Sequence, residues 1–278
     1  MKFRVVSWNI HKGIGGADRR YRLERIIEVL QVLAPDVALL QEVAEDMPRS
    51  RFHDQPSALA EALEIKHLAF GPEHRFRMGG YGNAILSRWP LTDISRVDLT
   101  IGTRKKRGAL TARAHVHGLG HERSLVLVNM HLGLAGSERG MQLERFLASK
   151  PFAHFQRRTP VVLGGDLNDV WGSLGPRYLQ PAGFGRCGSL LNTFPAYLPV
   201  RPLDAVFVRG DLEARGISVP KTKLAKQASD HLPLVADLNL VGLEAEVPRT
   251  KSASGHPSQP PPVSERSMVA SRRHGESH

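Results

Sequence analysis

Five apolar segments of the sequence each begin or end on a side chain that can bind a metal ion or exchange a proton. These side chains are Asn9, Glu42, His131, Asp166, Asn168, Asp230 and His231. If the segments are strands, they deliver their polar ends to one edge of a sheet, where ligands usually bind in α/β proteins. The pattern therefore predicts one shared site with metal ligands and acid–base groups.

The acidic and amide residues of this set suit a hard cation. Mg²⁺ prefers oxygen ligands and usually takes only one or two protein carboxylates, leaving positions for water and substrate phosphate. Glu42, Asp166 and Asp230 offer carboxylates, and Asn9 and Asn168 offer amide oxygens. Asp166 and Asn168 are two residues apart, so they point the same way in a strand. A cap or turn role is the alternative for each residue taken alone.

Two of the thirteen histidines stand beside an amide or a carboxylate in these segments. They are His131, close to Asn129, and His231, next to Asp230. A histidine held by a carboxylate can take a proton from water near neutral pH. Asp204 enters the apolar segment LDAVFV, where its burial is costly unless a partner such as an imidazole bonds it. The sequence thus suggests a His–Asp pair, with a turn role as the alternative for Asp204.

The charge balance favours an anionic partner. The chain carries 38 Lys and Arg against 27 Asp and Glu, a formal net charge of +11. Such a balance suits nucleic acid, an anionic lipid surface or a phosphorylated small molecule. The basic run Arg104–Arg107 can add phosphate-binding charge if its loop lies over the site. The alternatives are a solvated loop and general solubility.

Alternating strand and helix patterns position these residues. A strand pattern over residues 3–10 is followed by helical spacing that ends at Pro35 and by a short buried strand over residues 37–40. This β–α–β order implies parallel strands, which places Asn9 and Glu42 at the same sheet edge. Residues 94–101 and 108–116 predict an antiparallel hairpin, and residues 137–156 carry helical spacing. Together these elements predict an α/β fold with mixed sheets.

Length and composition predict one domain followed by a tail. A chain of 278 residues with 41% hydrophobic content can bury a full core, which we assign to residues 1–243. Residues 244–278 are rich in Ser, Pro and Arg without periodicity, so we expect them to be disordered.

The number of cysteines and the lengths of the apolar segments indicate the cellular compartment of the protein. The single cysteine, Cys187, excludes an internal disulfide. The first residues lack a secretory pattern, and no segment reaches the roughly 20 apolar residues of a membrane span. We therefore expect a cytoplasmic protein, without an integral membrane segment or an evident obligate protein partner.

The motifs, taken in order, resemble the endonuclease/exonuclease/phosphatase superfamily, which includes deoxyribonuclease I, apurinic-site endonucleases and neutral sphingomyelinases. They extend over residues 3 to about 240, and the complete series is far more specific than any one of them. The motifs are Trp8–Ile10, Gln41–Glu42, Gly82–Arg88, Asn129–Leu132, Gly165–Asn168, Leu203–Val208 and Ser229–Leu234. The resemblance implies a deoxyribonuclease I-like, four-layer α/β sandwich of two mixed sheets packed face to face between helices.

The resemblance also implies metal-dependent hydrolysis of a phosphoester. Glu42 would bind Mg²⁺, with Mn²⁺ as a possible substitute, and Asn9 and Asp230 would be further ligands or bind through water. Asp166 and Asn168 would orient the attacking water and the phosphate.

Acid–base and phosphate-binding roles follow from the same resemblance. His231, held by Asp204, would act as the general base, and His131 would contact the phosphoryl oxygens. Asn83 and Arg107 would support the site and the substrate phosphate. No equivalent is evident of the glutamate that holds the first histidine in deoxyribonuclease I.

The leading hypothesis is a phosphodiesterase, whose substrate is a nucleic acid, a phospholipid or another small phosphodiester. A phosphomonoesterase of the same fold and a non-catalytic phosphate-binding scaffold are the alternatives. No helix carries the strongly basic amphipathic face that settles on membranes. Nor do aromatic residues line up with the basic run, as a base-stacking surface would require.

Overall fold

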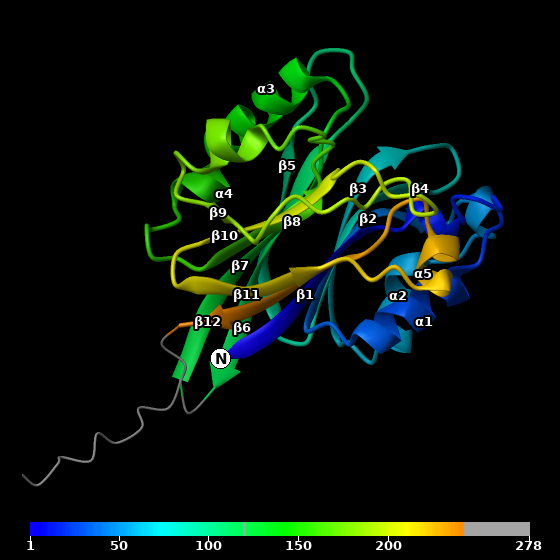
Figure 1. The fold of residues 1–278 in the computed structure, drawn as a ribbon, viewed down its shortest axis with the longest axis horizontal. Coiled ribbons are helices and arrows are strands. Elements are labelled where there is room, and N and C mark those ends of the chain that lie inside the picture. Colours follow the sequence, from blue (N-terminus) through cyan, green and yellow to red (C-terminus); the bar gives the residue numbers. More distant parts are fainter. Residues whose placement is uncertain (119–120, 242–278) are drawn as a thin grey trace, which may run out of the picture. The chain divides into compact units, whose positions relative to one another are not determined.

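The computed structural model describes residues 1–118 and 121–241, which form two six-stranded sheets packed face to face (Figure 1). Both sheets are mixed and have helices outside them, so the predicted four-layer sandwich is confirmed. The predicted tail, residues 244–278, lies outside the described residues. The division into a domain over residues 1–243 and this tail therefore stays a prediction.

The first sheet carries the β–α–β start of the chain. Its strand order is β11 (Leu212–Ser218), β12 (Leu234–Leu240), β1 (Lys2–Asn9), β2 (Val37–Glu45), β4 (Gly80–Ser87) and β3 (His67–Arg75). β1 and β2 are parallel, with Asn9 opposite Gln41, and the other neighbours are antiparallel. The predicted parallel pairing is confirmed, and it puts Asn9 and Glu42 at the same edge.

The second sheet repeats this arrangement around another parallel pair. Its order is β5 (Leu91–Asp98), β6 (Gly108–Gly118), β7 (His121–His131), β8 (Val161–Asp166), β10 (Asp204–Arg209) and β9 (Gly185–Arg186). Only the β7–β8 pairing is parallel. The antiparallel hairpin predicted around the basic run corresponds to β5 and β6.

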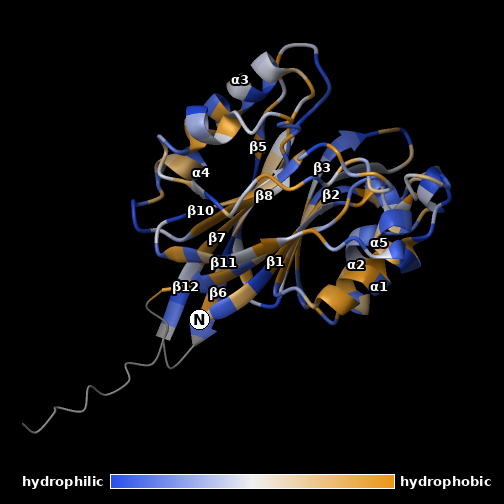
Figure 2. Cartoon of the chain, viewed as in Figure 1, coloured by the Kyte–Doolittle hydropathy of each residue, from blue (hydrophilic) through white to orange (hydrophobic). Residues whose placement is uncertain are grey.

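Apolar residues fill three layers, one between the sheets and one under each set of helices. Successive strand residues face opposite sides, so Val5 and Leu127 lie between the sheets while Val6 and Val128 face the helices. The helices are α1 (Leu23–Leu33), α2 (Gln55–Ala62) and α5 (Lys223–Ala228) on the first sheet, and α3 (Gly136–Leu147) and α4 (Lys150–Ala153) on the second. Figure 2 shows hydrophobic residues along the strands and on α1 and α2.

Short helical turns complete the framework. They are η1 (His11–Gly13), η2 (Pro48–Ser50) and η3 (Gly175–Leu179). No helix within residues 1–118 and 121–241 is long and apolar enough to cross a membrane.

Two predicted elements differ in extent from the observed ones. β2 does not stop at Glu42 but continues to Glu45, because a register shift between Leu40 and Val43 lets the strand go on. Glu42 itself has φ of 54° within this irregularity, and such bulges commonly re-aim a side chain next to an active site. The helix expected over residues 137–156 is split in two, since Pro151 begins a new helix in the first turn of α4.

Candidate active site

Three of the predicted catalytic residues lie side by side at the ends of neighbouring strands. His131 closes β7 and pairs in register with Asp166, which closes β8. Asp204 opens β10 and pairs with Asp166 from the other side. Because β10 is antiparallel to β8, its first residue meets the last residue of β8. The topology thus places an imidazole and a carboxylate on either side of Asp166.

The first sheet contributes to the same place. Asn9 at the end of β1 donates from Nδ2 to Asp166 Oδ2, 3.1 Å away, and so links the two sheets. The segment that precedes β12 is fixed on β1 by two hydrogen bonds. Ser229 Oγ donates to the Asn9 carbonyl at 2.7 Å, and Trp8 Nε1 donates to the His231 carbonyl at 2.8 Å. These contacts set the position of the His231 ring.

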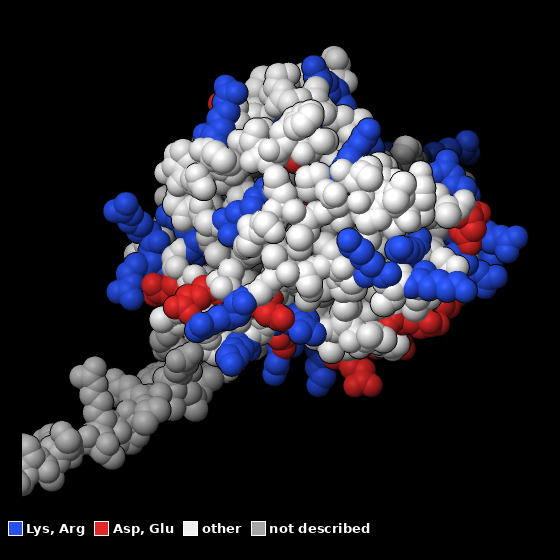
Figure 3. Space-filling model, in the orientation of Figure 1, with Lys and Arg blue, Asp and Glu red and all other residues white. Residues whose placement is uncertain are grey.

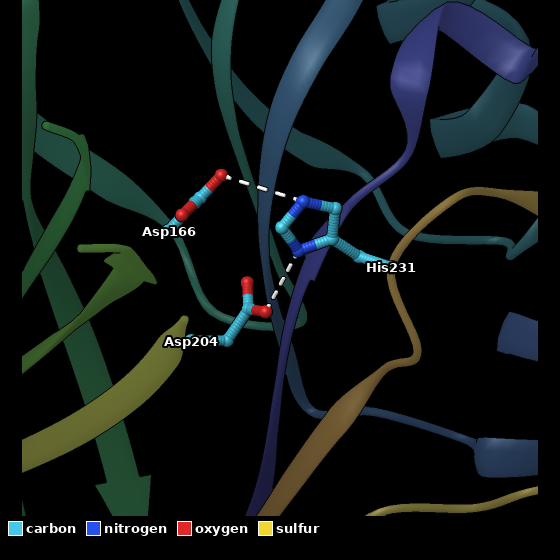
Figure 4. Close-up of side chains that lie close together, drawn as sticks. All are labelled: Asp166, Asp204 and His231. Carbon is cyan, nitrogen blue, oxygen red and sulfur yellow. Dashed lines mark hydrogen bonds and ion pairs between the residues drawn. The ribbon is translucent and has the colours of Figure 1, made fainter. Parts of the chain in front are cut away.

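The His231 ring lies between two carboxylates (Figure 4). Its Nδ1 is 2.8 Å from Asp204 Oδ2, and its Nε2 is 3.7 Å from Asp166 Oδ2. The Thr193 hydroxyl donates to the same Asp204 oxygen. The ring of Phe194 packs against the imidazole, with 4.9 Å between ring centroids. The structure therefore contains the expected His–Asp pair, and Thr193 is a second holder of Asp204.

The two carboxylates change the protonation of this group. Burial alone would lower the pKa of His231, but Asp204 and Asp166 raise it to about 10. Burial raises the pKa of Asp166 to about 6, although the neighbouring imidazolium opposes the change. At neutral pH the protein without ligand therefore holds a protonated His231 between negative partners.

His131 is buried and electrically different from His231. Its Nε2 is 3.3 Å from Asp166 Oδ2, and its Nδ1 has no hydrogen-bond partner among the described residues. Burial, together with the charge of Arg107, holds the pKa of His131 well below its usual value. A neutral imidazole has a single N–H, so this ring donates either to Asp166 through Nε2 or, in the other tautomer, to a phosphoryl oxygen through Nδ1.

The turn after β8 fixes the Asp166 carboxylate. The Asn168 backbone N–H donates to Asp166 Oδ1 at 3.1 Å, and Asn168 Nδ2 donates to the Leu132 carbonyl at 3.0 Å. Gly165 has φ of 147°, and a Cβ there would stand 1.8 Å from the Met130 carbonyl oxygen. Glycine is therefore required immediately before Asp166.

Glu42 is held by a lysine that the sequence did not single out. The Lys12 ammonium bonds Glu42 Oε2. Burial would raise the pKa of Glu42, but His131 and Lys12 lower it to about 2. The carboxylate is thus charged, and it already faces a cation.

Asp230 immediately precedes His231 and is more exposed than the residues above. Its Oδ1 accepts a hydrogen bond from Ser229 Oγ at 3.3 Å and lies 3.8 Å from His11 Nδ1. With Tyr197 and Lys226 it lines a cavity of about 280 Å³. Asp230 therefore borders a small cavity beside the segment that precedes β12.

Asn83 and Arg107 are joined through a buried glutamate. Asn83 Nδ2 donates to Glu73 Oε1 at 2.9 Å, and Arg107 Nη1 lies 3.9 Å from Glu73 Oε2. Burial raises the pKa of Glu73 to about 7, although Arg107 opposes the change. Arg107 Nε and Nη1 have no hydrogen-bond partners within the described ranges, so this buried guanidinium has donors available for an anion.

Two places in this site could hold a metal ion, one at a group of three residues and one at Glu42. Ligand atoms of Asp166, Asp204 and His231 all lie within 4.8 Å of one another, and the buried Asp204 Oδ1 lacks a hydrogen-bond partner among the described residues. Glu42 offers a charged carboxylate that faces the Lys12 ammonium. Mg²⁺ favours oxygen over imidazole ligands, so the Glu42 position suits it better than a position that would break the His231–Asp204 hydrogen bond.

Figure 3 shows many Lys and Arg side chains over one face of the molecule. Lys and Arg side chains surround the upper part of this face, and most of the Asp and Glu side chains lie lower down or at its edge. Two aromatic residues near the catalytic strands differ in exposure. The Trp171 side chain, which follows β8, is 82% exposed, whereas Phe194 contacts His231.

Comparisons with known proteins agree with this geometry. A sequence model described as the Endonuclease/Exonuclease/phosphatase family matches residues 6–231. The chain is 28% identical over 251 residues to the uncharacterized protein YbhP of Escherichia coli, which covers 86% of this chain and 96% of that protein.

Solved structures show the same architecture. An endonuclease/exonuclease/phosphatase from Beutenbergia cavernae DSM 12333 superposes with a TM-score of 0.72 at 28% identity, covering 87% of this chain and 72% of that one. Truncated Caenorhabditis elegans TDP2 superposes with a TM-score of 0.64 over 86% of this chain and 98% of its own. At 18% identity the second likeness concerns the fold alone.

Proposed function

Because the chain belongs to the endonuclease/exonuclease/phosphatase family, we propose that it is a Mg²⁺-dependent phosphodiesterase. The observation that carries this proposal is the convergence on Asp166. A His–Asp pair, a neutral histidine and an amide from the opposite sheet all reach the same carboxylate. This set provides a proton acceptor beside groups that can bind phosphate.

We assign the metal to Glu42, supported by Asn9 and Asp230. When bound there, Mg²⁺ supplies polarisation of the phosphate, and Mn²⁺ can replace it. The assignment is supported by the charged state of Glu42 and by the cation that already pairs with it.

We assign activation of water to His231. Asp204 holds Nδ1, and Nε2 is directed towards Asp166, so the neutral form of the ring can accept a proton from water at Nε2. Thr193 fixes Asp204 in turn. Since the two carboxylates raise the pKa of His231 to about 10, its neutral form grows as the pH rises. Asp166 and Asn168 orient the attacking water and the phosphate.

We assign phosphate binding to His131 and Arg107. The His131 ring is neutral, so it can donate a hydrogen bond to a phosphoryl oxygen. Arg107 is buried with unsatisfied N–H groups and can neutralise part of the phosphate charge. Asn83 supports Arg107 through Glu73.

The positive net charge of the chain favours an anionic substrate. A net charge of +11 suits both nucleic acid and an anionic lipid or small phosphodiester. Hydrolysis of bis-p-nitrophenyl phosphate and p-nitrophenyl phosphate, each with Mg²⁺ and with EDTA, tests the proposal. We expect metal-dependent cleavage of the diester to dominate. Dominant cleavage of the monoester would identify a phosphomonoesterase, and no cleavage of either would favour a phosphate-binding scaffold.

A further inference from the structure

Three aromatic rings lie nearly parallel to one another at the edge of the catalytic site. The rings of His74 and Tyr81 have centroids 4.6 Å apart and an interplanar angle of 25°. Phe76 lies 6.4 Å from His74 at 13° and 6.1 Å from Tyr81 at 29°. They come from the end of β3, the start of β4 and the turn between these strands. We call these three residues the ring cluster.

The ring cluster adjoins Glu42. Tyr81 pairs in register with Ala44 of β2, two residues beyond Glu42. The Lys12 ammonium that bonds Glu42 also lies 4.5 Å from the centroid of the Tyr81 ring. One lysine thus contacts both the proposed metal ligand and the ring cluster, so a substrate phosphate at Glu42 would be close to these rings.

The outer ring is open to solvent. The Phe76 side chain is 55% exposed, whereas Tyr81 beneath it is 7% exposed. A ring that is exposed to this extent adds little to the core, so its outer face is available to a ligand. An incoming flat ring can therefore lie against Phe76.

Basic side chains surround the rings, contrary to the expectation that aromatics do not line up with the basic run. Lys105 of that run lies 5.7 Å from the Tyr81 ring centroid. Arg75 and Arg77 flank Phe76 in the chain and are exposed. This arrangement could not be predicted from the sequence, because the β3–β4 turn and the basic run are separate in the chain and come together only in the folded protein.

The rings themselves are uncharged. Burial, together with Lys105 and Arg107, lowers the pKa of His74 to about 4, so its imidazole is neutral at physiological pH. The cluster is thus a neutral π surface with cations at its border. Single-stranded nucleic acids are bound by this combination, in which bases stack on aromatic rings and the backbone follows basic side chains.

We propose that His74, Phe76 and Tyr81 form a stacking site for an unpaired nucleobase beside the scissile phosphate. The proposal rests on the phosphodiesterase function and specifies its substrate as single-stranded nucleic acid. A base-paired nucleotide has both faces covered in the duplex, so it cannot stack on Phe76. A lipid would gain little here, because Phe76 is the one exposed ring of the three.

The test compares two oligonucleotides with the same backbone. One is single-stranded with normal bases, and the other carries abasic tetrahydrofuran residues. We expect kcat/KM with Mg²⁺ to be about tenfold higher for the first, in line with the usual strength of base stacking. Phe76→Ala should remove most of this preference, and Phe76→Tyr should keep it. Phe52→Ala is the matched control, because Phe52 is similarly exposed at 56% and lies outside the ring cluster.

Each contrary result has a distinct meaning. Equal kcat/KM for the two oligonucleotides, or an unchanged preference in Phe76→Ala, would overturn the stacking site while leaving the phosphodiesterase in place. Preferred cleavage of duplex DNA or of phosphatidylglycerol vesicles would overturn it as well. If no phosphodiester is cleaved, fluorescence anisotropy of the two labelled oligonucleotides still tests the stacking site. Stacking requires wild type to bind the base-bearing oligonucleotide more tightly than Phe76→Ala does, and equal binding would overturn the proposal.

Discussion

His231 Nδ1 lies 2.8 Å from Asp204 Oδ2 in a buried contact between the segment preceding β12 and the first residue of β10. Asp204 opens a strand of the second sheet and His231 lies just before a strand of the first, so this hydrogen bond joins the halves of the sandwich at the candidate site. Thr193, whose hydroxyl donates to the same Asp204 oxygen, was not expected from the sequence. The contact orients the imidazole and stabilises its protonated form.

Asp204→Asn tests the orienting role of this contact. The amide keeps the size of the side chain but removes the charge that fixes the imidazole and its tautomer. We expect kcat to fall by about 10²–10⁴-fold, as for comparable removal of a histidine-orienting carboxylate, while the circular dichroism spectrum stays unchanged. Steady-state kinetics on a p-nitrophenyl diester measure this, and activity near the wild-type value would contradict the role of Asp204.

The pH dependence of kcat/KM should follow His231. Its pKa is raised to about 10, so the proton stays on at neutral pH and the neutral, proton-accepting form increases as the pH rises. We therefore expect activity to increase above pH 7, and Asp204→Asn to move this rise to lower pH. A single rise near pH 6 that is unaffected by Asp204→Asn would instead indicate Asp166, whose pKa is about 6, as the proton acceptor.

Glu42→Gln tests the metal assignment. The substitution keeps an oxygen donor but removes the charge that attracts a divalent cation. We expect the Mg²⁺ concentration for half-maximal activity to rise by at least about tenfold, since a charged ligand contributes a few kcal/mol to such sites. Mg²⁺ titration of activity measures the change, with the exposed Glu61→Gln as the matched control. Equal Mg²⁺ requirements in the two variants would place the metal elsewhere.

Gly165→Ala tests the backbone beneath the site. The new Cβ would stand 1.8 Å from the Met130 carbonyl at a φ of 147°, whereas a Cβ at Gly216 meets nothing within 4 Å. We expect the free energy of unfolding to fall by at least about 2 kcal/mol for Gly165→Ala and to change by less than about 0.5 kcal/mol for Gly216→Ala. Urea denaturation measures both, and similar stabilities would show that β8 can shift.

Residues at the ends of strands could be predicted from the sequence better than the residues of the turns and loops that contact them. The β–α–β order was enough to place Asn9 and Glu42 at one edge, and the costly burial of Asp204 was enough to suggest its pairing with an imidazole. Lys12 and Thr193 lie in irregular segments, where no periodicity indicates the direction of a side chain. Glu73 and the ring cluster lie in the β3–β4 hairpin, but their contacts with Arg107 and Lys105 join segments that are distant in the chain. Contacts of this kind arise from the packing of whole elements and leave no local pattern.

The most direct test of the proposed function is the rate of Mg²⁺-dependent hydrolysis of bis-p-nitrophenyl phosphate by His231→Ala and His117→Ala. His117 is an exposed histidine at the opposite end of the second sheet, where it pairs with Glu122. We predict that the rate of hydrolysis falls by at least about 10²-fold in His231→Ala and stays at the wild-type value in His117→Ala. With EDTA, neither variant should hydrolyse the substrate. Wild-type activity in His231→Ala, or hydrolysis that persists with EDTA, would contradict the proposed mechanism.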